Sequence, residues 1–393
     1  MAGIGAPAGN RRLLVAGIVA ALGLLVLVGR AQQQALPVAE PPARTVLPVL
    51  PVLPPTVAVR PLADLARLHI SPPVDPLGAE AFPVAVGHGA VWVVLHGDLV
   101  RIDPRRNQVT ARVRVSLPEQ VVDVLLAGGT VWVATSAGVV GVDPRTGRVL
   151  GTVRINGRSS PVAAEDGSLW WLACEGPAAA GRCRLLRRDP PTLAVAAVVP
   201  LPEAVVSVPE AVVPGVAVQG GSVWVLSGAG PGLWRLRVAG GAPARVALPL
   251  VSAPAPARAM AHGTAVASGL GAVWVLTDLY AAAAPAGTRI GPALLRIDPT
   301  TGTVAAALPL ADLDRPVALA IGARSVWVQG WQIHQDQGAT VSLVVERVDP
   351  ATLRVVEAFD TGADADSRMA IGLGALWVTH PSTGDLLHVA ADG

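Results

Sequence analysis

A tryptophan that recurs seven times in the same local setting constrains the fold more than any other feature of this sequence. Each copy ends a short run rich in glycine and small or β-branched residues, as in "GHGAVWV", "QGGSVWV" and "GLGALWV", and successive copies are 38 to 54 residues apart. Repeats of this length and composition are typical of β-propeller blades. The seven tryptophans are Trp92, Trp132, Trp170, Trp224, Trp274, Trp327 and Trp377.

The residues around each tryptophan predict four short strands per repeat. An apolar run such as 83–87 precedes the tryptophan strand, and a third strand ends in "RIDP", "GVDP" or "RVDP" before a fourth strand such as 148–155. In these turns the aspartate bonds its own backbone, the proline presets the next dihedral angle, and a later glycine takes a left-handed conformation. The middle strands are apolar at nearly every position, which predicts sheets buried on both faces. Frequent glycine and the lack of a sustained 3.6-residue period argue against helical repeats.

The last repeat has three strands where the others have four. Residues 369–393 supply those three, whereas residues 65–70, ahead of the first repeat, have the pattern of a fourth strand. A ring left open would expose raw sheet edges at both ends. The sequence therefore predicts an all-β fold over residues 62–393, a seven-bladed propeller of four-stranded antiparallel blades, closed by an N-terminal strand that completes the last blade.

The N-terminal region has the composition of a membrane segment followed by a spacer. Residues 13–29 carry no charge and lie between Arg12 and Arg30, and as a helix they would be roughly 25 Å long, at the short end of what crosses a bilayer. A cleaved signal peptide and a twin-arginine signal are the alternatives, but the cleavage pattern is poor. We expect a transmembrane signal anchor at 13–30, with residues 1–12 in the cytoplasm. The proline-rich stretch 31–61 predicts an extended stalk, which places the propeller on the extracytoplasmic side of the cell membrane.

Charge and cysteine content narrow the class of protein further. The formal net charge is only +2, and no stretch concentrates arginine beside aromatic residues, which argues against nucleic acid as a partner. Cys174 and Cys183 flank a short connection that can bring them face to face, so they predict a disulfide in an oxidising compartment, with two buried thiols as the alternative. The seven histidines are scattered singly, which argues against a zinc site.

The repeat unit "GAVWV…LVRIDPRRNQVTARVRV" resembles bacterial propellers of the YVTN, PQQ-like and virginiamycin B lyase-like superfamily, over about residues 65–393. The resemblance implies the fold but no single activity, because the superfamily contains lyases, dehydrogenases, lactonases and binding proteins. Quinone-dependent members carry a docking tryptophan where this sequence has Gly151 and Ala306, so no quinone cofactor is implied. No histidine and glutamate pair matches the catalytic pair of the lyases.

Long loops in repeats four to six are candidates for ligand recognition, because long loops on a rigid scaffold often carry function. The loop 330–338 contains Trp331, His334 and Asp336. A tryptophan gives contact area, and the polar pair gives direction to a recognition surface. The alternative is an ordinary polar hairpin tip.

Two further connections, "ADLDRP" and "GADADSR", share one pattern of two aspartates followed by an arginine. Because they lead into neighbouring repeats, we expect them on one rim. Four carboxylates there suit calcium, but the spacing of a dedicated calcium loop is missing, and each aspartate can instead pair with its own arginine; no metal site is therefore assigned. The residues are Asp312, Asp314, Arg315, Asp364, Asp366 and Arg368.

Together these features predict a membrane-anchored platform rather than an enzyme. One rim of the propeller would present a rigid surface to an envelope protein or a cell-wall component. The alternative is a lyase-type or lactonase-type enzyme with its site at the mouth of the central channel. An enzyme requires a compact cluster of inward-facing polar residues with shifted pKa values, and a platform requires an exposed patch on the long loops.

Overall fold

The computed structural model describes residues 57–70, 82–115, 121–135, 138–154, 158–163, 167–175, 182–190, 192–201, 215–226, 232–248, 259–281, 289–334, 340–362 and 367–391. These ranges belong to one compact unit, Val49–Gly393. The predicted segments 1–12 and 13–30, and residues 31–56 of the predicted stalk, lie outside them. Within these ranges the helical element η1 (Leu62–Asp64) has three residues, and no helix is long and apolar enough to span a bilayer.

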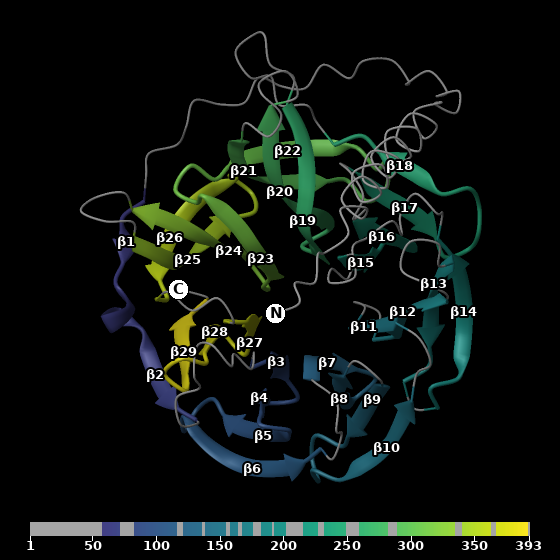
Figure 1. The fold of residues 1–393 in the computed structure, drawn as a ribbon, viewed down its shortest axis with the longest axis vertical. Coiled ribbons are helices and arrows are strands. Elements are labelled where there is room, and N and C mark those ends of the chain that lie inside the picture. Colours follow the sequence, from purple (N-terminus) through teal and green to yellow (C-terminus); the bar gives the residue numbers. More distant parts are fainter. Residues whose placement is uncertain are drawn as a thin grey trace, which may run out of the picture. The chain divides into compact units, whose positions relative to one another are not determined.

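Seven antiparallel meanders follow one another around a ring (Figure 1), which confirms the predicted seven-bladed β-propeller. Blade 1 contains β3 (Val84–Gly87), β4 (Ala90–Leu95), β5 (Asp98–Asp103) and β6 (Gln108–Arg114), and blade 2 contains β7 (Val121–Ala127), β8 (Thr130–Thr135), β9 (Gly138–Val142) and β10 (Val149–Arg154). Blade 3 contains β11 (Arg158–Ala163), β12 (Leu169–Glu175), β13 (Arg182–Arg188) and β14 (Val195–Pro200), and blade 4 contains β15 (Val216–Gln219), β16 (Ser222–Leu226), β17 (Leu233–Arg237) and β18 (Ala244–Val246).

The last three blades follow the same plan, and most strands of blades 5 and 6 are longer than those of blade 1. Blade 5 contains β19 (Ala259–Gly269), β20 (Ala272–Ala281), β21 (Arg289–Ile297) and β22 (Val304–Pro309). Blade 6 contains β23 (Arg315–Ile321), β24 (Val326–His334), β25 (Thr340–Asp349) and β26 (Arg354–Asp360), and blade 7 contains β27 (Met369–Gly372), β28 (Ala375–His380) and β29 (Asp385–Ala390). The first strand of each blade faces the centre of the ring (Figure 1). We call the side where these inner strands begin the link face, and the opposite side the turn face.

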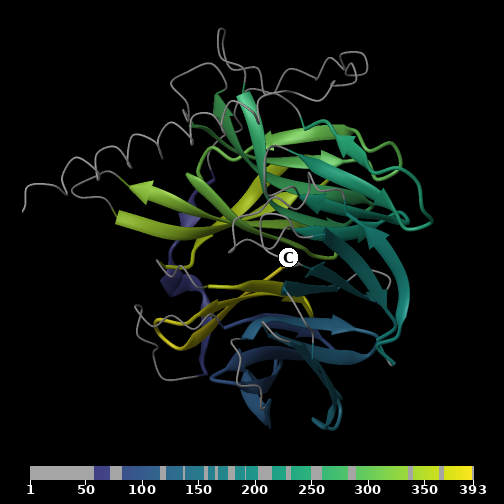
Figure 2. The same ribbon diagram turned by 45° about the vertical axis from the view of Figure 1, so that its right-hand side comes forward.

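The core consists of seven apolar clusters, and each one fills the space between two neighbouring blades. Trp377, Val84 and Val93, for example, pack between blade 7 and blade 1, whose strands lie against one another in yellow and blue (Figure 2). All seven motif tryptophans are at most 3% exposed. Because every blade is covered by a neighbour on both sides, its middle strands are apolar at most positions on both faces, as the sequence predicted.

An arginine opposite the tryptophan ties several blades to the next one. Arg235 pairs in register with Trp224, stacks over its ring at 5.2 Å, and donates from Nη1 to the carbonyl of Thr300 in blade 5 at 2.8 Å. Arg296 and Arg347 repeat this link towards the following blade, to the carbonyls of Pro350 and Ala391. The "R" of the "RIDP" pattern is therefore part of the packing between blades.

The predicted aspartate turns are confirmed on the turn face. In four blades the Oδ1 atom of the aspartate accepts the backbone N–H groups two and three residues further on, for example those of Thr300 and Thr301 for Asp298. These bonds favour the charged form and hold the pKa of each aspartate below its usual value. The four residues are Asp103, Asp143, Asp298 and Asp349.

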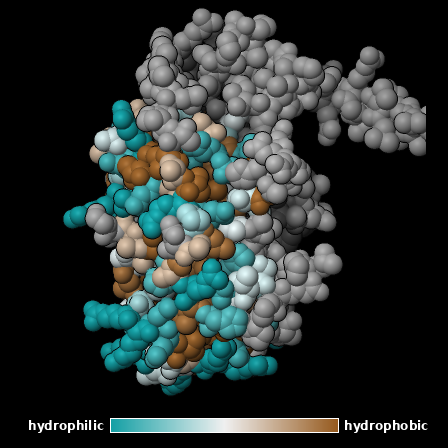
Figure 3. All heavy atoms as spheres, turned by 90° about the vertical axis from the view of Figure 1, so that its left-hand side faces the viewer, coloured by the Kyte–Doolittle hydropathy of each residue, from teal (hydrophilic) through white to brown (hydrophobic). Residues whose placement is uncertain are grey.

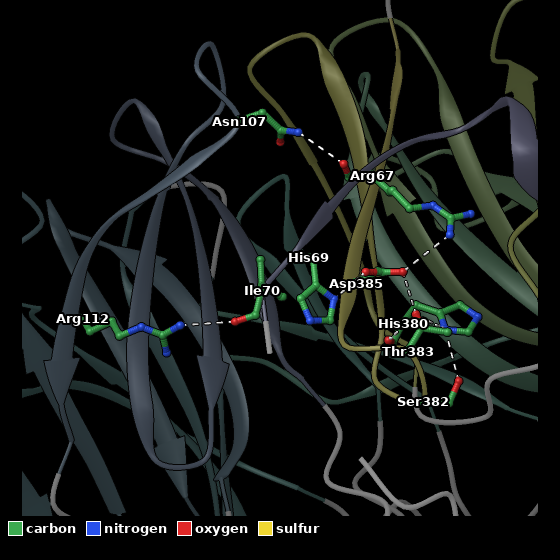
Figure 4. Close-up of polar contacts among 9 residues, drawn as sticks. All are labelled: Arg67, His69, Ile70, Asn107, Arg112, His380, Ser382, Thr383 and Asp385. Carbon is green, nitrogen blue, oxygen red and sulfur yellow. Dashed lines mark hydrogen bonds and ion pairs between the residues drawn. The ribbon is translucent and has the colours of Figure 1, made fainter. Parts of the chain in front are cut away.

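Strand β2 (Ala66–His69) lies antiparallel to β29, from the pair Ala66–His388 to the pair His69–Asp385. Side chains from both adjoining blades hold it (Figure 4). Within blade 7, His69 Nδ1 lies 3.1 Å from Asp385 Oδ1, and Arg67 Nη1 lies 3.8 Å from Asp385 Oδ2. From blade 1, Asn107 donates to the carbonyl of Arg67 and Arg112 donates to that of Ile70.

The residues just ahead of β2 also pair with the ring. Strand β1 (Val59–Arg60) runs parallel to β26 as a fifth strand of blade 6, and Arg60 lies over the ring of Phe359 at 5.2 Å. These two residues fall within the stretch 31–61 that the sequence assigned to the stalk. Hydrophobic and hydrophilic residues alternate in patches on the side that carries β1 and β2 (Figure 3).

The two cysteines lie opposite one another in blade 3. Cys174 on β12 pairs in register with Cys183 on β13, and Cys183 is disulfide-bonded. Since the sequence contains two cysteines in all, this bond joins the two middle strands of blade 3 beside their connection of eight residues.

Candidate functional site

Blade 6 departs from the other repeats at two buried positions. Glu346 stands one residue before the arginine that pairs with the motif tryptophan, and Gln329 stands two residues after that tryptophan. The other six repeats have apolar residues at the first position, and five of them also have apolar residues at the second. The equivalents of Glu346 are Val100, Val140, Leu186, Trp234, Leu295 and Leu387; those of Gln329 are Val94, Ala134, Leu172, Leu226, Leu276 and Thr379.

Glu346 is a carboxylic acid enclosed in the blade. It lies on β25 opposite Val328 and Ala358, its side chain is 1% exposed, and its Oε2 atom has no hydrogen-bonding partner. Burial raises the pKa of Glu346 to about 8, and the neighbouring Asp312 carboxylate adds to the increase. Glu346 is therefore mainly protonated at neutral pH.

Gln329 lies on the next strand and points to the opposite face of the blade, because its cross-strand partner is Val345 and not Glu346. It is fully buried, and neither polar atom of its amide has a hydrogen-bonding partner. Blade 6 thus holds buried polar atoms without hydrogen-bonding partners on opposite faces. Such groups are rare in native proteins, because an unpaired buried polar group typically costs about 1–3 kcal/mol.

The link-face end of blade 6 brings together part of the predicted recognition set. Asp314 accepts the backbone N–H of Ile333 at 2.6 Å, and its own N–H donates to the carbonyl of Trp331 at 2.7 Å. Asp314 therefore fixes the start of β23 against the far end of β24. Partial burial raises the pKa of the adjacent Asp312 above its usual value. No ion pair joins either aspartate to Arg315 among the described contacts.

The hairpin β24–β25 is longer than the equivalent hairpin of blade 1. In blade 1 the second strand ends three residues after the tryptophan, whereas β24 continues for seven residues after Trp327. Ile333 and Val341 face each other across the extension and are each 40% exposed, and Trp331 is half-buried. The backbone of His334 pairs with Thr340. Asp336 lies outside the described residues.

Of the second predicted set of residues, from the connection "GADADSR", only the arginine lies in the described part of the chain. Asp364 and Asp366 lie outside it, and the exposed Arg368 precedes the inner strand β27. No three histidine, cysteine, aspartate or glutamate side chains among the described residues stand close enough together to hold a metal ion. The calcium hypothesis is therefore untested at the two aspartates that it needs from blade 7.

The sequence analysis named Arg368 but missed Asp123, whose carboxyl group feels the charge of Arg368. Asp123 on inner strand β7 and Arg368 both stand nine residues before the tryptophan of their blade, in blades 2 and 7. The Asp123 side chain touches solvent, yet protein surrounds it on most sides, and this enclosure raises its pKa above the usual value, against the lowering effects of the Val124 N–H and the Arg368 charge. Comparing the same position across the repeats would have revealed this pair.

Blade 7 contains a polar network that links its last turn to β2 (Figure 4). His380 Nδ1 lies 3.2 Å from Ser382 Oγ and 3.1 Å from Thr383 Oγ1, and Thr383 donates to Asp385 Oδ2 at 2.9 Å. His69 reaches the other oxygen of Asp385. The two histidines looked isolated because they are more than 300 residues apart in the sequence. Both hydroxyls bond one imidazole nitrogen inside a tight turn, so the network stabilises the turn and does not present an activated nucleophile.

Comparisons with known proteins leave the family of this chain open. No family model matches the sequence, and no curated protein matches it either. Among solved structures, the chain is similar to BamB from Moraxella catarrhalis, with 16% sequence identity and a TM-score of 0.46 over 84% of this chain and 95% of that one.

Proposed function

We propose that this protein is a membrane-anchored, extracytoplasmic propeller that binds another protein or a cell-wall component of the cell envelope on its link face. The observation that carries the proposal is the extended hairpin β24–β25, which exposes Ile333 and Val341 side by side. Exposed apolar side chains on a projecting, hydrogen-bonded hairpin suit a protein interface, because they bury apolar area without a large loss of flexibility.

Neighbouring groups support a recognition role for this hairpin. Asp314 holds its backbone in place, so the apolar pair is presented on a rigid element. The half-buried Trp331 and the carboxyl group of Asp312 lie on the same end of the blade and offer contact area and polarity. The uncharged stretch 13–29 supports the membrane anchor, and the disulfide at Cys183 supports an oxidising compartment.

A photo-crosslinking experiment in intact cells tests the proposal. A photoreactive residue at position 333 of the full chain should give one discrete protein or glycan adduct, and the change Val341→Asp should reduce its yield at least about fivefold. Position 198 is the matched control, because Val198 is apolar and 54% exposed on the outer strand of blade 3. The same adduct from position 198, or an unchanged yield in the Val341→Asp variant, would contradict the proposal.

A lyase-type or lactonase-type enzyme is the second candidate, favoured by Asp123 on an inner strand and by the charge of Arg368 that acts on it. A carboxyl group with a raised pKa beside a cation is a typical acid–base arrangement. If this candidate is right, turnover of a lactone panel is lost in Asp123→Asn and retained in Ile333→Asp. The platform proposal predicts that neither variant changes the low background rate.

We also infer that β2 closes the ring and that the chain belongs to the YVTN, PQQ-like and virginiamycin B lyase-like superfamily. The pairing of β2 with β29 and the contacts from blade 1 support the closure. Deleting residues 62–72 should cause loss of cooperative thermal unfolding, whereas deleting residues 36–56 should leave the unfolding temperature within about 2 °C. Equal stability of the two deletion variants would show that β2 is dispensable.

A further inference from the structure

The aspartate turns of blades 1 and 2 differ from the other aspartate turns at one position. Two residues after the aspartate, blades 1 and 2 carry Arg105 and Arg145, whereas blades 3, 5 and 6 carry a proline, a threonine and an alanine. In blades 1, 2, 5 and 6 the Oδ1 atom of the aspartate accepts the backbone N–H of this residue. Because any residue other than proline can donate that bond, the arginine side chains are not needed to form the turn.

Each of these two turns holds a second arginine, Arg106 in blade 1 and Arg148 in blade 2, and all four side chains are exposed on the turn face. We call these four arginines the basic patch. Arg106 pairs with Asp103 at 3.3 Å. Among the described contacts, no hydrogen bond or ion pair engages the guanidinium groups of the other three arginines. These three groups therefore remain available to a partner.

Acidic residues are scarce around the basic patch. Residues 99–118 and 124–164 contain nine arginines, and their only acidic residues are Asp103 and Asp143. The Oδ1 atom of each aspartate is engaged by two backbone N–H groups of its own turn. These bonds, chiefly the one from the N–H of Arg145, lower the pKa of Asp143, and the charge of Arg145 adds to the effect. With four arginines against two aspartates, the surface keeps a net positive charge.

The two arginine-bearing turns lie next to one another on the ring, and apolar side chains border them. A Cβ atom at Gly147 would lie 3.2 Å from Cγ2 of Val113, so the turn of blade 2 packs against the outer strand β6 of blade 1. Val149 and Leu150 follow Arg148 directly, at the turn-face end of β10, and are 42% and 48% exposed. The surface therefore combines guanidinium groups with exposed apolar side chains.

The direction of strand β1 indicates from which side the N-terminal part of the chain reaches the propeller. The outer strand β26 runs from its aspartate turn on the turn face towards the link face, and β1 lies parallel to it. The N-terminal end of β1 is therefore directed towards the turn face. The uncharged stretch 13–29 lies ahead of β1 in the sequence, so a membrane anchor there favours a membrane on the turn-face side.

We propose that the basic patch docks the propeller, with its turn face down, on a membrane surface rich in anionic phospholipid. This inference rests on the membrane anchor of the proposed function. Guanidinium groups form charge-assisted, often bidentate hydrogen bonds with phosphate oxygens, and exposed apolar side chains beside them enter the boundary between headgroups and acyl chains. A tethered propeller has a high effective concentration at the membrane, so a few weak contacts are sufficient. The link face, with the hairpin β24–β25, then points away from the membrane towards its partner.

Fluorescence quenching in vesicles that hold the full-length protein tests the docking. A fluorophore is attached through Thr146→Cys in the turn of blade 2 or, as the matched control, through Thr301→Cys at the same position in the turn of blade 5; both threonines are exposed. Because Cys183 is disulfide-bonded, the introduced thiol is labelled selectively. With about 30% phosphatidylglycerol, a nitroxide on the lipid headgroups should quench position 146 at least about threefold more than position 301. In pure phosphatidylcholine, or at about 0.5 M salt, this excess at position 146 should disappear.

Replacing the arginines links the quenching to the basic patch. Arg148→Gln should lower the quenching at position 146 at least about twofold, and the double change with Arg145→Gln should lower it to the level of position 301. Arg354→Gln is the matched control, because Arg354 is exposed and stands five residues after its turn aspartate, as Arg148 does. It removes the same charge from blade 6 and should change the quenching by less than about 20%. Thermal unfolding of each variant checks that the fold is unchanged.

Three results would overturn the proposal. The first is equal quenching of positions 146 and 301 in vesicles with phosphatidylglycerol, which would assign the basic patch to a soluble partner. The second is an excess at position 146 that persists in pure phosphatidylcholine or at high salt, which would indicate an orientation set by the tether alone. The third is an equal loss of quenching from Arg148→Gln and Arg354→Gln, which would indicate general attraction of a basic protein.

Flotation of the full-length protein with the same vesicles at high salt tests the anchor separately. Loss of flotation would contradict the membrane anchor and the docking together. Flotation without an excess of quenching at position 146 would refute the docking and leave the proposed function intact.

Discussion

Blade 1 and blade 6 are built from the same repeat and differ in what they enclose. Both place a tryptophan against an arginine and end their third strand in an aspartate turn. Blade 1 fills the rest of its middle strands with Val94 and Val100, whereas blade 6 places Gln329 and Glu346 there. Blade 6 also has the longer hairpin. The comparison shows that the repeat fixes the framework, while individual positions within it are available for other tasks.

The shared framework predicts the largest effect. Trp92→Ala in blade 1 and Trp327→Ala in blade 6 should each lower the free energy of unfolding by about 3–5 kcal/mol, because both rings are fully buried between blades. Denaturant unfolding monitored by circular dichroism measures both losses. A much smaller loss in blade 6 would mean that its framework is already loosened by the buried polar groups.

The next effect on stability is expected from introducing a buried carboxyl group into blade 1. Val100→Glu places an acid in a fully buried position that has no preformed polar surroundings, so the free energy of unfolding should fall by about 3 kcal/mol or more at pH 8. The loss should be smaller at pH 5, where the acid is protonated. Unfolding at the two pH values gives the difference. A variant as stable as the parent would show that blade 1 tolerates a buried acid as well as blade 6 does.

Removing the titratable acid from blade 6 should have an effect on stability that depends on pH. The pKa of Glu346 in the folded protein is about 8, above its usual value of 4.5, so the folded state holds this proton more tightly than the unfolded state does. Its contribution to stability is complete below about pH 4.5 and is lost as the pH rises to 8, by up to about 1.4 kcal/mol per pH unit. Glu346→Gln should remove this slope.

Thermal or denaturant unfolding of the parent and of Glu346→Gln at pH 5, 6.5 and 8 checks this slope. Asp312→Asn is the accompanying variant, since removal of its negative charge should shift the slope to lower pH. Parallel curves for the parent and Glu346→Gln would indicate that Glu346 is ionised and solvated in the folded protein.

The smallest difference in stability between the two blades is expected from replacing the arginine opposite the motif tryptophan. Arg347 of blade 6 bonds the carbonyl of Ala391 at 3.0 Å and pairs with Glu357 at 3.0 Å. Among the described contacts, the hydrogen bond of Arg101 in blade 1 is to Thr110 of its own blade, at 3.5 Å. Arg347→Met should therefore destabilise the protein by about 1 kcal/mol more than Arg101→Met. Paired unfolding curves detect this difference, and equal losses would show that the link to the next blade adds nothing.

Much of the fold was predictable because its signals are local. The aspartate turns and the tryptophan strands are each set by a few adjacent residues, and seven repetitions fix the number of blades. The buried acid was missed for a different reason. Glu346 sits in the motif "VERVDP", and its burial becomes evident only when the register pairs it with Val328 and Ala358. Aligning the repeats position by position would have singled it out.

The candidate site was less predictable, because it depends on residues that the sequence separates. Asp314 was expected to bind a ligand or Arg315, but it bonds the backbone of Ile333, a contact set by the length of β24. Strand β1 was also missed, since two residues are too few to give a periodic signal.

The order in which β1 and β2 attach has a mechanical consequence. Tension applied through the residues before Val59 reaches β1 first, and β1 is held by a two-residue parallel pair; the four-residue pair of β2 with β29 is loaded only afterwards. We therefore expect the pairing of β1 with β26 to break before the pairing of β2 with β29. In the anchored protein that we propose, rupture of this pair would lengthen the linker by a few residues while β2 stays paired with β29.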